Sequence, residues 1–113
     1  EIEIFALRKS MPKIDASNIV RLEEKADKLG DACRKQDLGA VVKCDIDFHR
    51  SLLDCAGEDD LTAIWLPLVT RMVMNYSRHI DMSQSHDEHL EILNAVREKN
   101  LRRSIQALKV NIQ

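Results

Sequence analysis

Apolar residues recur along this chain at intervals of three and four, the spacing that places side chains on one face of an α-helix. The pattern divides into six amphipathic segments. The expected helices cover residues 2–11, a stretch that starts near Asp15 or Ser17 and reaches Cys33, then 37–57, 59–80, 85–100 and 101–113. The pattern therefore predicts an all-α protein.

Residues with known positional preferences mark the ends of these helices. Pro12 is expected to end the first helix, and Gly57 is expected to follow the last turn of the third. The expected N-caps are Asp15 or Ser17, then Asp37, Asp59 or Asp60, and Ser85, which opens a Ser85-His86-Asp87-Glu88 capping box. Pro67 predicts a kink in the fourth helix. Short links between helices favour an antiparallel bundle of about six helices.

Composition supports one helical domain over residues 1–113. The chain has 113 residues, 44% of them hydrophobic and only 4% aromatic, with three Gly and two Pro, which disfavours a barrel or sandwich of short strands. A net charge of −2 excludes a strongly basic nucleic-acid-binding surface. No apolar run reaches the roughly 18–20 residues of a membrane span. Three cysteines without CxxC spacing indicate reduced thiols in a cytoplasmic protein.

Polar residues interrupt the apolar face of the third helix. That face is formed by Leu38, Val41, Phe48, Leu52 and Cys55. Asp45 falls within it, and His49 follows one turn later. A buried carboxylate needs a partner, so the pair is either a satisfied Asp–His contact or half of a metal site, because this spacing lets both side chains reach one ion.

Other helices repeat this anomaly. His89 lies at the head of the apolar stripe of the fifth helix, and Asn75 and His79 share the apolar face of the fourth, with Arg71 at its edge. Each of these residues could be hydrogen-bonded structure. Together they predict a polar site in the interior of the bundle.

Two short motifs resemble the signatures of a known family. Asp45-Ile46-Asp47-Phe48-His49 with Leu52 resembles the D-x-x-F-H-x-x-L signature of the FCD domain, the C-terminal effector-sensing half of many GntR-type bacterial transcription regulators. The run 88–96, Glu-His-Leu-Glu-Ile-Leu-Asn-Ala-Val, resembles its E-H-x-x-I-L-x-A-I signature, with 40 residues between the two histidines as in the family. The resemblance extends over nearly the whole chain.

The resemblance implies an antiparallel all-α bundle that binds a divalent metal such as zinc, nickel or manganese. Carried over by position, the metal ligands are Asp45, His49 and His89, and the fourth falls on Asn111, where the family has a histidine. An amide oxygen is a poorer ligand for zinc or nickel than an imidazole. The family also binds small organic acids. The residues expected to contact the acid are Arg71, Asn75, Arg78 and His79.

The function implied is an effector-binding and dimerisation domain rather than an enzyme. The winged helix-turn-helix of such regulators is absent from this sequence, so contact with DNA is expected only through a domain outside it, and a homodimer is expected. Two alternatives stay open. One is a metal-free helical interaction module with a structural Asp/His core; the other is a small metal-dependent hydrolase using the same three ligands.

Overall fold

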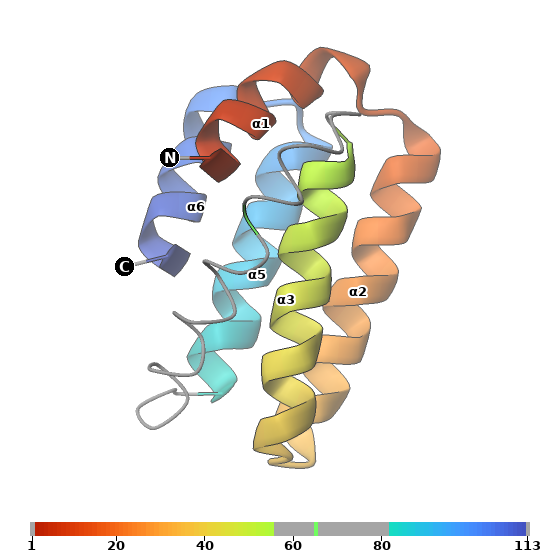
Figure 1. The fold of residues 1–113 in the computed structure, drawn as a ribbon, viewed down its shortest axis with the longest axis vertical. Coiled ribbons are helices and arrows are strands. Elements are labelled where there is room, and N and C mark those ends of the chain that lie inside the picture. The colour runs from red at the N-terminus through yellow and green to blue at the C-terminus, as the bar shows by residue number, and fades with distance from the viewer. Residues whose placement is uncertain (1, 56–64, 66–81, 113) are drawn as a thin grey trace.

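The computed structural model describes residues 2–55, 65 and 82–112. Its elements are α1 (Ile2–Ser10), the 3-10 helix η1 (Met11–Lys13), α2 (Ala16–Arg34), α3 (Leu38–Asp54), α5 (Met82–Arg97) and α6 (Leu101–Ile112) (Figure 1). Helices account for nearly all of the described residues, and none of the described residues lies in a strand. The predicted all-α class is confirmed.

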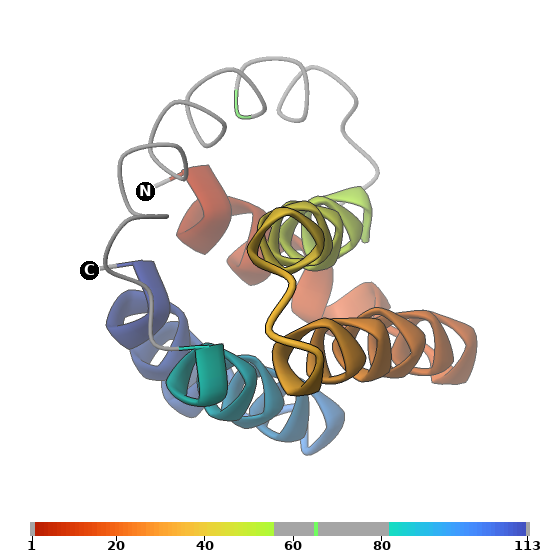
Figure 2. The same ribbon diagram turned by 90° about the horizontal axis from the view of Figure 1, so that it is seen from below.

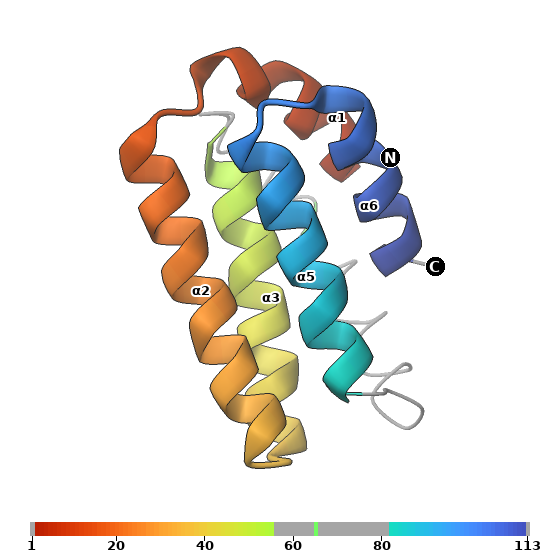
Figure 3. The ribbon, with the colours of Figure 1, turned by 180° about the vertical axis from the view of Figure 1, so that it is seen from behind.

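The helices form two antiparallel hairpins that pack side by side. One hairpin joins α2 to α3 and the other joins α5 to α6, and α2 also packs against α5. Helix α1 crosses one end of the bundle and contacts α3 and α6 (Figure 3). Seen along the bundle, α1, α3, α5 and α6 surround a common interior, with α2 on the outer side of α3 and α5 (Figure 2). Side chains from four helices can therefore meet there.

The start of the chain differs from the predicted helix over residues 2–11. Helix α1 ends at Ser10, and Met11–Lys13 form one 3-10 turn because Pro12 cannot donate the next helical hydrogen bond. Of the two predicted N-caps of α2, Asp15 and Ser17, Asp15 is the one observed. Its carboxylate accepts from the Asn18 backbone N–H while the Asn18 side chain accepts from the Asp15 N–H.

Both hairpin links use the same helix-ending geometry. Gln36 and Lys99 have φ values of 54° and 57°, so each occupies the left-handed position that follows a helix. The next residue then lies directly before the first residue of the following helix. Asp37 accepts from the Ala40 N–H, as predicted, and Asn100 accepts from the Arg103 N–H. These tight links hold α3 beside α2 and α6 beside α5.

The predicted capping box at Ser85 was wrong. Helix α5 starts three residues earlier, at Met82, so Ser85 and Glu88 lie within the helix. Ser85 is buried there, and the Glu88 carboxylate accepts from Gln84 and Asn111. The predicted end near Asn100 also moves, to Arg97.

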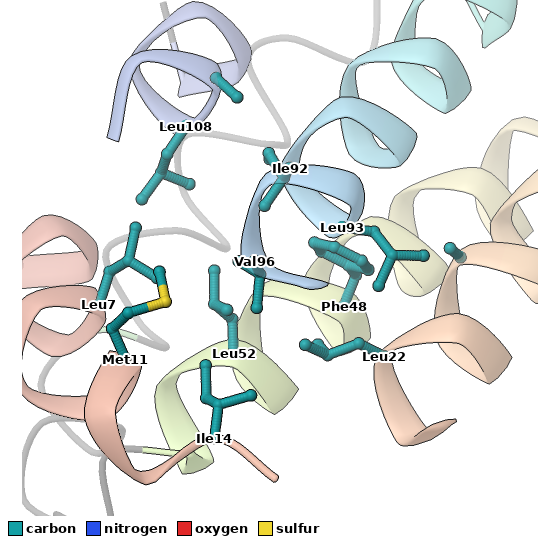
Figure 4. Close-up of a cluster of buried hydrophobic side chains, with 12 residues drawn as sticks. Leu7, Met11, Ile14, Leu22, Phe48, Leu52, Ile92, Leu93, Val96 and Leu108 are labelled. Carbon is teal, nitrogen blue, oxygen red and sulfur yellow. The ribbon is translucent and has the colours of Figure 1, made fainter. Parts of the chain in front are cut away.

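The main hydrophobic core joins α1, η1, α2, α3, α5 and α6 (Figure 4). Its largest fully buried members include Leu7, Leu22, Phe48, Leu52 and Leu108. As predicted, Val41, Phe48 and Leu52 form the buried side of α3, whereas Leu38 is 37% exposed. The main core therefore fixes the C-terminal half of α3 through Phe48 and Leu52, while Val41 packs with Leu29 and Ala32 of α2 in a smaller cluster.

A glycine inside α2 is explained by a histidine on α5. A Cβ added at Gly30 would lie 2.6 Å from the Nε2 atom of His86, so the imidazole occupies the space that a side chain would need. His86 is half-buried here. Gly30 permits this close contact between α2 and α5 at the cost of lower helix propensity.

Gly30→Ala is expected to have opposite effects in two backgrounds. In His86→Ala, alanine should stabilise the chain by about 1 kcal/mol through helix propensity. In the wild-type chain, the clash with the imidazole should cancel that gain or reverse it. Urea unfolding of the four variants of this double-mutant cycle measures the difference. Equal effects in both backgrounds would contradict the contact.

Several predictions fall outside the described residues. These are the C-cap at Gly57, the helix over 59–80 and the kink at Pro67.

The three cysteines are half-buried free thiols, and burial raises the pKa of each. No helix in the described ranges is both long enough and apolar enough for a membrane span.

Candidate metal centre

Three predicted residues meet in the interior of the bundle. Asp45 and His49 lie one turn apart on α3, and His89 projects from α5. Asp45 Oδ1 lies 2.7 Å from His89 Nε2 and 3.3 Å from His49 Nε2, and the two Nε2 atoms are 3.1 Å apart. His49 is 4% exposed and His89 is fully buried. The packing of α3 and α5 against α2 thus brings together residues 40 and more positions apart.

The Nδ1 atom of His49 faces a buried carboxylate from α1. Glu3 Oε1 is in hydrogen-bond contact with this nitrogen. An ionised carboxylate only accepts hydrogen bonds, so Nδ1 of His49 carries the proton and donates it. In the neutral ring, Nε2 then has a free lone pair that points into the cluster.

His89 is oriented in the same way by its own helix. Its Nδ1 atom lies 2.6 Å from the backbone carbonyl oxygen of Ser85, four residues earlier on α5. A carbonyl oxygen only accepts, so Nδ1 of His89 is the donor and Nε2 is left with a lone pair. Both imidazoles therefore present Nε2 to the same point.

A fourth acceptor comes from α6. Asn111 Oδ1 lies 2.7 Å from His49 Nε2, while Asn111 Nδ2 donates to Glu88 Oε1 at 3.0 Å. Glu88 therefore fixes the amide with its oxygen toward the histidines. The position carried over from the family resemblance does reach the cluster, with an oxygen in place of a nitrogen.

Four atoms that carry lone pairs thus converge. When both imidazoles are neutral, none of these four atoms carries a hydrogen that it could donate to another. They are Asp45 Oδ1, His49 Nε2, His89 Nε2 and Asn111 Oδ1. The first three lie 2.7–3.3 Å from one another, and Asn111 Oδ1 lies 2.7 Å from His49 Nε2. Acceptors repel one another at such distances unless a positive charge lies among them. That charge is either a proton on an imidazole or a bound cation.

The donor set fits a divalent cation. Imidazole nitrogens suit zinc and nickel, and carboxylate and amide oxygens suit manganese. Two ligand atoms about 2.0–2.1 Å from a tetrahedral zinc ion lie about 3.3 Å apart, close to the longer spacings here. Among the described residues, the Asp45, His49 and His89 ligand atoms form a group within 4.8 Å that is able to hold a metal. Hydrogen bonds on both Nδ1 atoms supply the outer support that metal-bound histidines usually have.

Electrostatics make the cluster strongly attractive to positive charge. Burial opposes a charged His49, but the carboxylates of Glu3 and Asp45 raise its pKa well above the ordinary value. Burial also opposes ionisation of Asp45, yet its contacts with His49 and His89 hold its pKa well below the ordinary value. Burial tends to raise the pKa of Glu3, but the contacts with His49 and the Trp65 indole outweigh this effect, so the pKa is lowered. Two carboxylates therefore remain ionised beside His49.

The metal-free chain is expected to be most stable between about pH 4.5 and 6.5. The stability contributed by His49 is complete below its unfolded pKa of about 6.5 and is lost as the pH rises through its raised folded pKa. The stability contributed by Glu3 and Asp45 is present above their unfolded pKa values of about 4 and is lost as the pH falls through their lowered folded values. Urea midpoints measured in EDTA from pH 3 to 9 test this. A stability that keeps rising from pH 6.5 to 9 would contradict the assignment.

Aromatic rings pack against the histidines of the cluster. The Phe48 ring packs edge-on against both imidazoles, with centroid distances of 5.8 Å to His49 and 4.9 Å to His89. The buried indole of Trp65 lies 6.5 Å from the His49 ring. This packing limits the rotation of the histidines and lowers the local dielectric constant, which strengthens binding of a cation by Asp45.

Sequence reasoning placed some site residues and missed others. The proposed acid-binding residues Arg71, Asn75, Arg78 and His79 lie outside the described residues. The other described histidine, His86, packs against Gly30 and not into the cluster. Glu3, Ser85 and Glu88, which orient the cluster, were missed, because their roles depend on contacts between helices that periodicity does not reveal.

Comparison with known proteins agrees with this architecture. The model of the FCD domain family matches residues 1–113. A solved structure described as E. coli McbR/YncC aligns with a TM-score of 0.87 and 17% sequence identity, covering 99% of this chain and 59% of that one. Our chain thus spans somewhat more than half of that protein. No match was found among curated protein sequences. The chain belongs to the FCD domain family, the C-terminal regulatory domains of GntR-type bacterial transcription regulators.

Proposed function

We propose that this domain senses a small organic acid through a divalent metal held by Asp45, His49 and His89, with Asn111 as the fourth group. The observation that carries the proposal is the convergence of four acceptor atoms in the bundle interior, two of them imidazole nitrogens whose tautomers are fixed from outside. Family membership supports an effector-binding role. It also rules out the hydrolase alternative, because FCD domains are regulatory domains and not enzymes.

The donor set leaves room for an exogenous ligand. Four protein groups do not complete the octahedral shell that manganese or nickel commonly adopts. Asp45 keeps 18% of its side chain exposed, so the cluster lies near solvent and not in a sealed core. A carboxylate of the effector would occupy an open position and balance the charge of the metal. Arg71, Asn75, Arg78 and His79 are proposed to bind the rest of the acid.

Regulation would follow because the metal-binding groups lie on different helices. The four groups come from α3, α5 and α6, and the outer carboxylate Glu3 comes from α1. An acid that prefers one arrangement of these helices shifts the population toward it. In a dimeric regulator in the bacterial cytoplasm, this shift would change the spacing of two attached DNA-binding domains.

A melting-temperature screen tests the proposal. The purified chain is heated with mono-, di- and tricarboxylates, each with EDTA, Zn²⁺, Ni²⁺ or Mn²⁺. We expect one class of acid to raise the melting temperature only when a metal is present, because the acid binds through the metal. A shift of equal size in EDTA would show that acid binding does not use the metal.

A metal-free structural core is the second candidate. It is favoured by the raised pKa of His49, because a proton can supply the positive charge that the acceptors require. No buried side-chain nitrogen or oxygen among the described residues lacks a hydrogen-bond partner. His89→Leu separates the two: a purely structural network is destabilised equally with and without metal, whereas a metal site also loses its metal-dependent gain.

A further inference from the structure

Glu3 is a charged residue in a position that packing alone does not explain. It lies in the first turn of α1, yet it is only 6% exposed. Burial of a carboxylate is unfavourable unless partners compensate for it. Its neighbours on α1, Ala6 and Leu7, are buried and apolar, so an apolar side chain would suit the helix packing.

The partners of Glu3 point to the cluster. Its carboxylate accepts from His49 Nδ1, and the indole N–H of Trp65 donates to it as well. Asp45, the other carboxylate beside His49, lies on the Nε2 side of the ring. Glu3 therefore contacts the His49 ring at Nδ1, on the side away from Nε2 and the other three converging acceptors.

We propose that Glu3 is a positioning residue of the metal centre and that it links the seating of α1 to metal occupancy. This inference rests on the proposed function. By holding the Nδ1 proton, Glu3 keeps the lone pair of Nε2 directed at the metal and makes the imidazole a stronger ligand. Glu3 is not a member of the metal-competent group of Asp45, His49 and His89.

The link to α1 follows from thermodynamic reciprocity. When α1 leaves the bundle, Glu3 leaves His49, and the metal is held with the lower affinity of a chain without Glu3. The metal therefore stabilises the seated form of α1 by the same factor by which Glu3 raises metal affinity. Hydrogen exchange of the α1 amides reports this factor whenever α1 opens locally.

The experiment compares Zn²⁺ and Mn²⁺ affinities of four chains: wild type, Glu3→Ala, Glu3→Gln and Ser10→Ala. We expect Glu3→Ala to raise the Kd by 10–100-fold, the usual cost of losing an outer partner of a metal-bound histidine. The glutamine of Glu3→Gln can still accept the hydrogen bond but carries no charge, so the Kd of this variant should lie between those of the wild type and Glu3→Ala. Ser10→Ala removes a buried hydroxyl of α1 that donates to the Leu7 carbonyl oxygen within the same helix, so it controls for general loosening of α1.

Each outcome decides the question. A raised Kd in Glu3→Ala, partly restored in Glu3→Gln and unchanged in Ser10→Ala, supports the proposal, as does metal-induced slowing of α1 exchange by a similar factor in the wild type. Wild-type affinity in both Glu3 variants, or an equal loss in Ser10→Ala, overturns it while the metal site itself stands. A wild-type chain that binds neither metal overturns the proposed function, and this inference falls with it.

Discussion

Asp45→Ala is expected to abolish the stabilisation that a divalent metal gives to this chain. Asp45 is the anionic member of the cluster and lies within 3.3 Å of both Nε2 atoms. At a metal concentration about 1,000 times the Kd, binding to the folded state alone adds about 4 kcal/mol to the free energy of unfolding. Urea unfolding with Zn²⁺ or Mn²⁺ and with EDTA measures this gain, which should fall to about zero in the variant.

Asp47→Ala is the matched control for this test. Asp47 lies two residues further along α3 and outside the metal-competent group. The control should keep the full metal-dependent gain. If Asp45→Ala and Asp47→Ala lose the same amount, or if neither loses any, the metal does not bind at the cluster.

Phe48→Ala is expected to destabilise the chain by about 3–5 kcal/mol, the range for removing a large aromatic side chain from a core. Phe48 is fully buried, belongs to the main core, and packs edge-on against both imidazoles of the cluster. Its loss leaves a cavity and also frees the two histidines to rotate. Chemical denaturation in EDTA isolates the packing cost from any effect on metal binding.

Phe5→Ala provides the comparison for this substitution. Phe5 is 47% exposed on α1, where Lys9 lies over its ring. Its replacement should change the free energy of unfolding by about 0.5 kcal/mol or less, as is usual at the surface. A cost below about 1 kcal/mol for Phe48→Ala would contradict its place in the core.

Helix positions were well predicted where the signal is local. Asp15 and Asp37 cap α2 and α3 because a short side-chain acceptor before an amphipathic run is sufficient to start a helix. The start of α5 was predicted wrongly, because the S-x-x-E pattern occurs both at helix N-caps and within helices. The 3-10 turn at Pro12 shows the same limit, since proline indicates an end to the helix but not the geometry that follows.

The cluster was predictable only in part. Periodicity places Asp45, His49 and His89 on buried faces, but it does not say that residues 40 positions apart meet; the resemblance to the family supplied that pairing. Glu3 carries no such signal, because an acidic residue in a first turn usually faces solvent and favours the helix dipole. Its burial depends on how α1 crosses α3, which is a property of the tertiary packing.

Asn111 shows how a departure from the family pattern changes meaning in the structure. As a sequence difference it argues for weaker metal binding. In the structure its oxygen lies 2.7 Å from His49 Nε2, and Glu88 fixes its orientation. We therefore expect a site with two nitrogens and two oxygens, which lowers the preference for zinc relative to manganese.

The most direct test of the metal centre is the metal content of the purified chain. The wild type and Asp45→Ala are dialysed against micromolar Zn²⁺, Ni²⁺ and Mn²⁺ and then against metal-free buffer, and bound metal is measured by elemental analysis. We predict about one ion per wild-type chain and none in Asp45→Ala. A wild-type chain that retains none of the three metals, with a melting temperature unchanged by adding them, would contradict the metal centre.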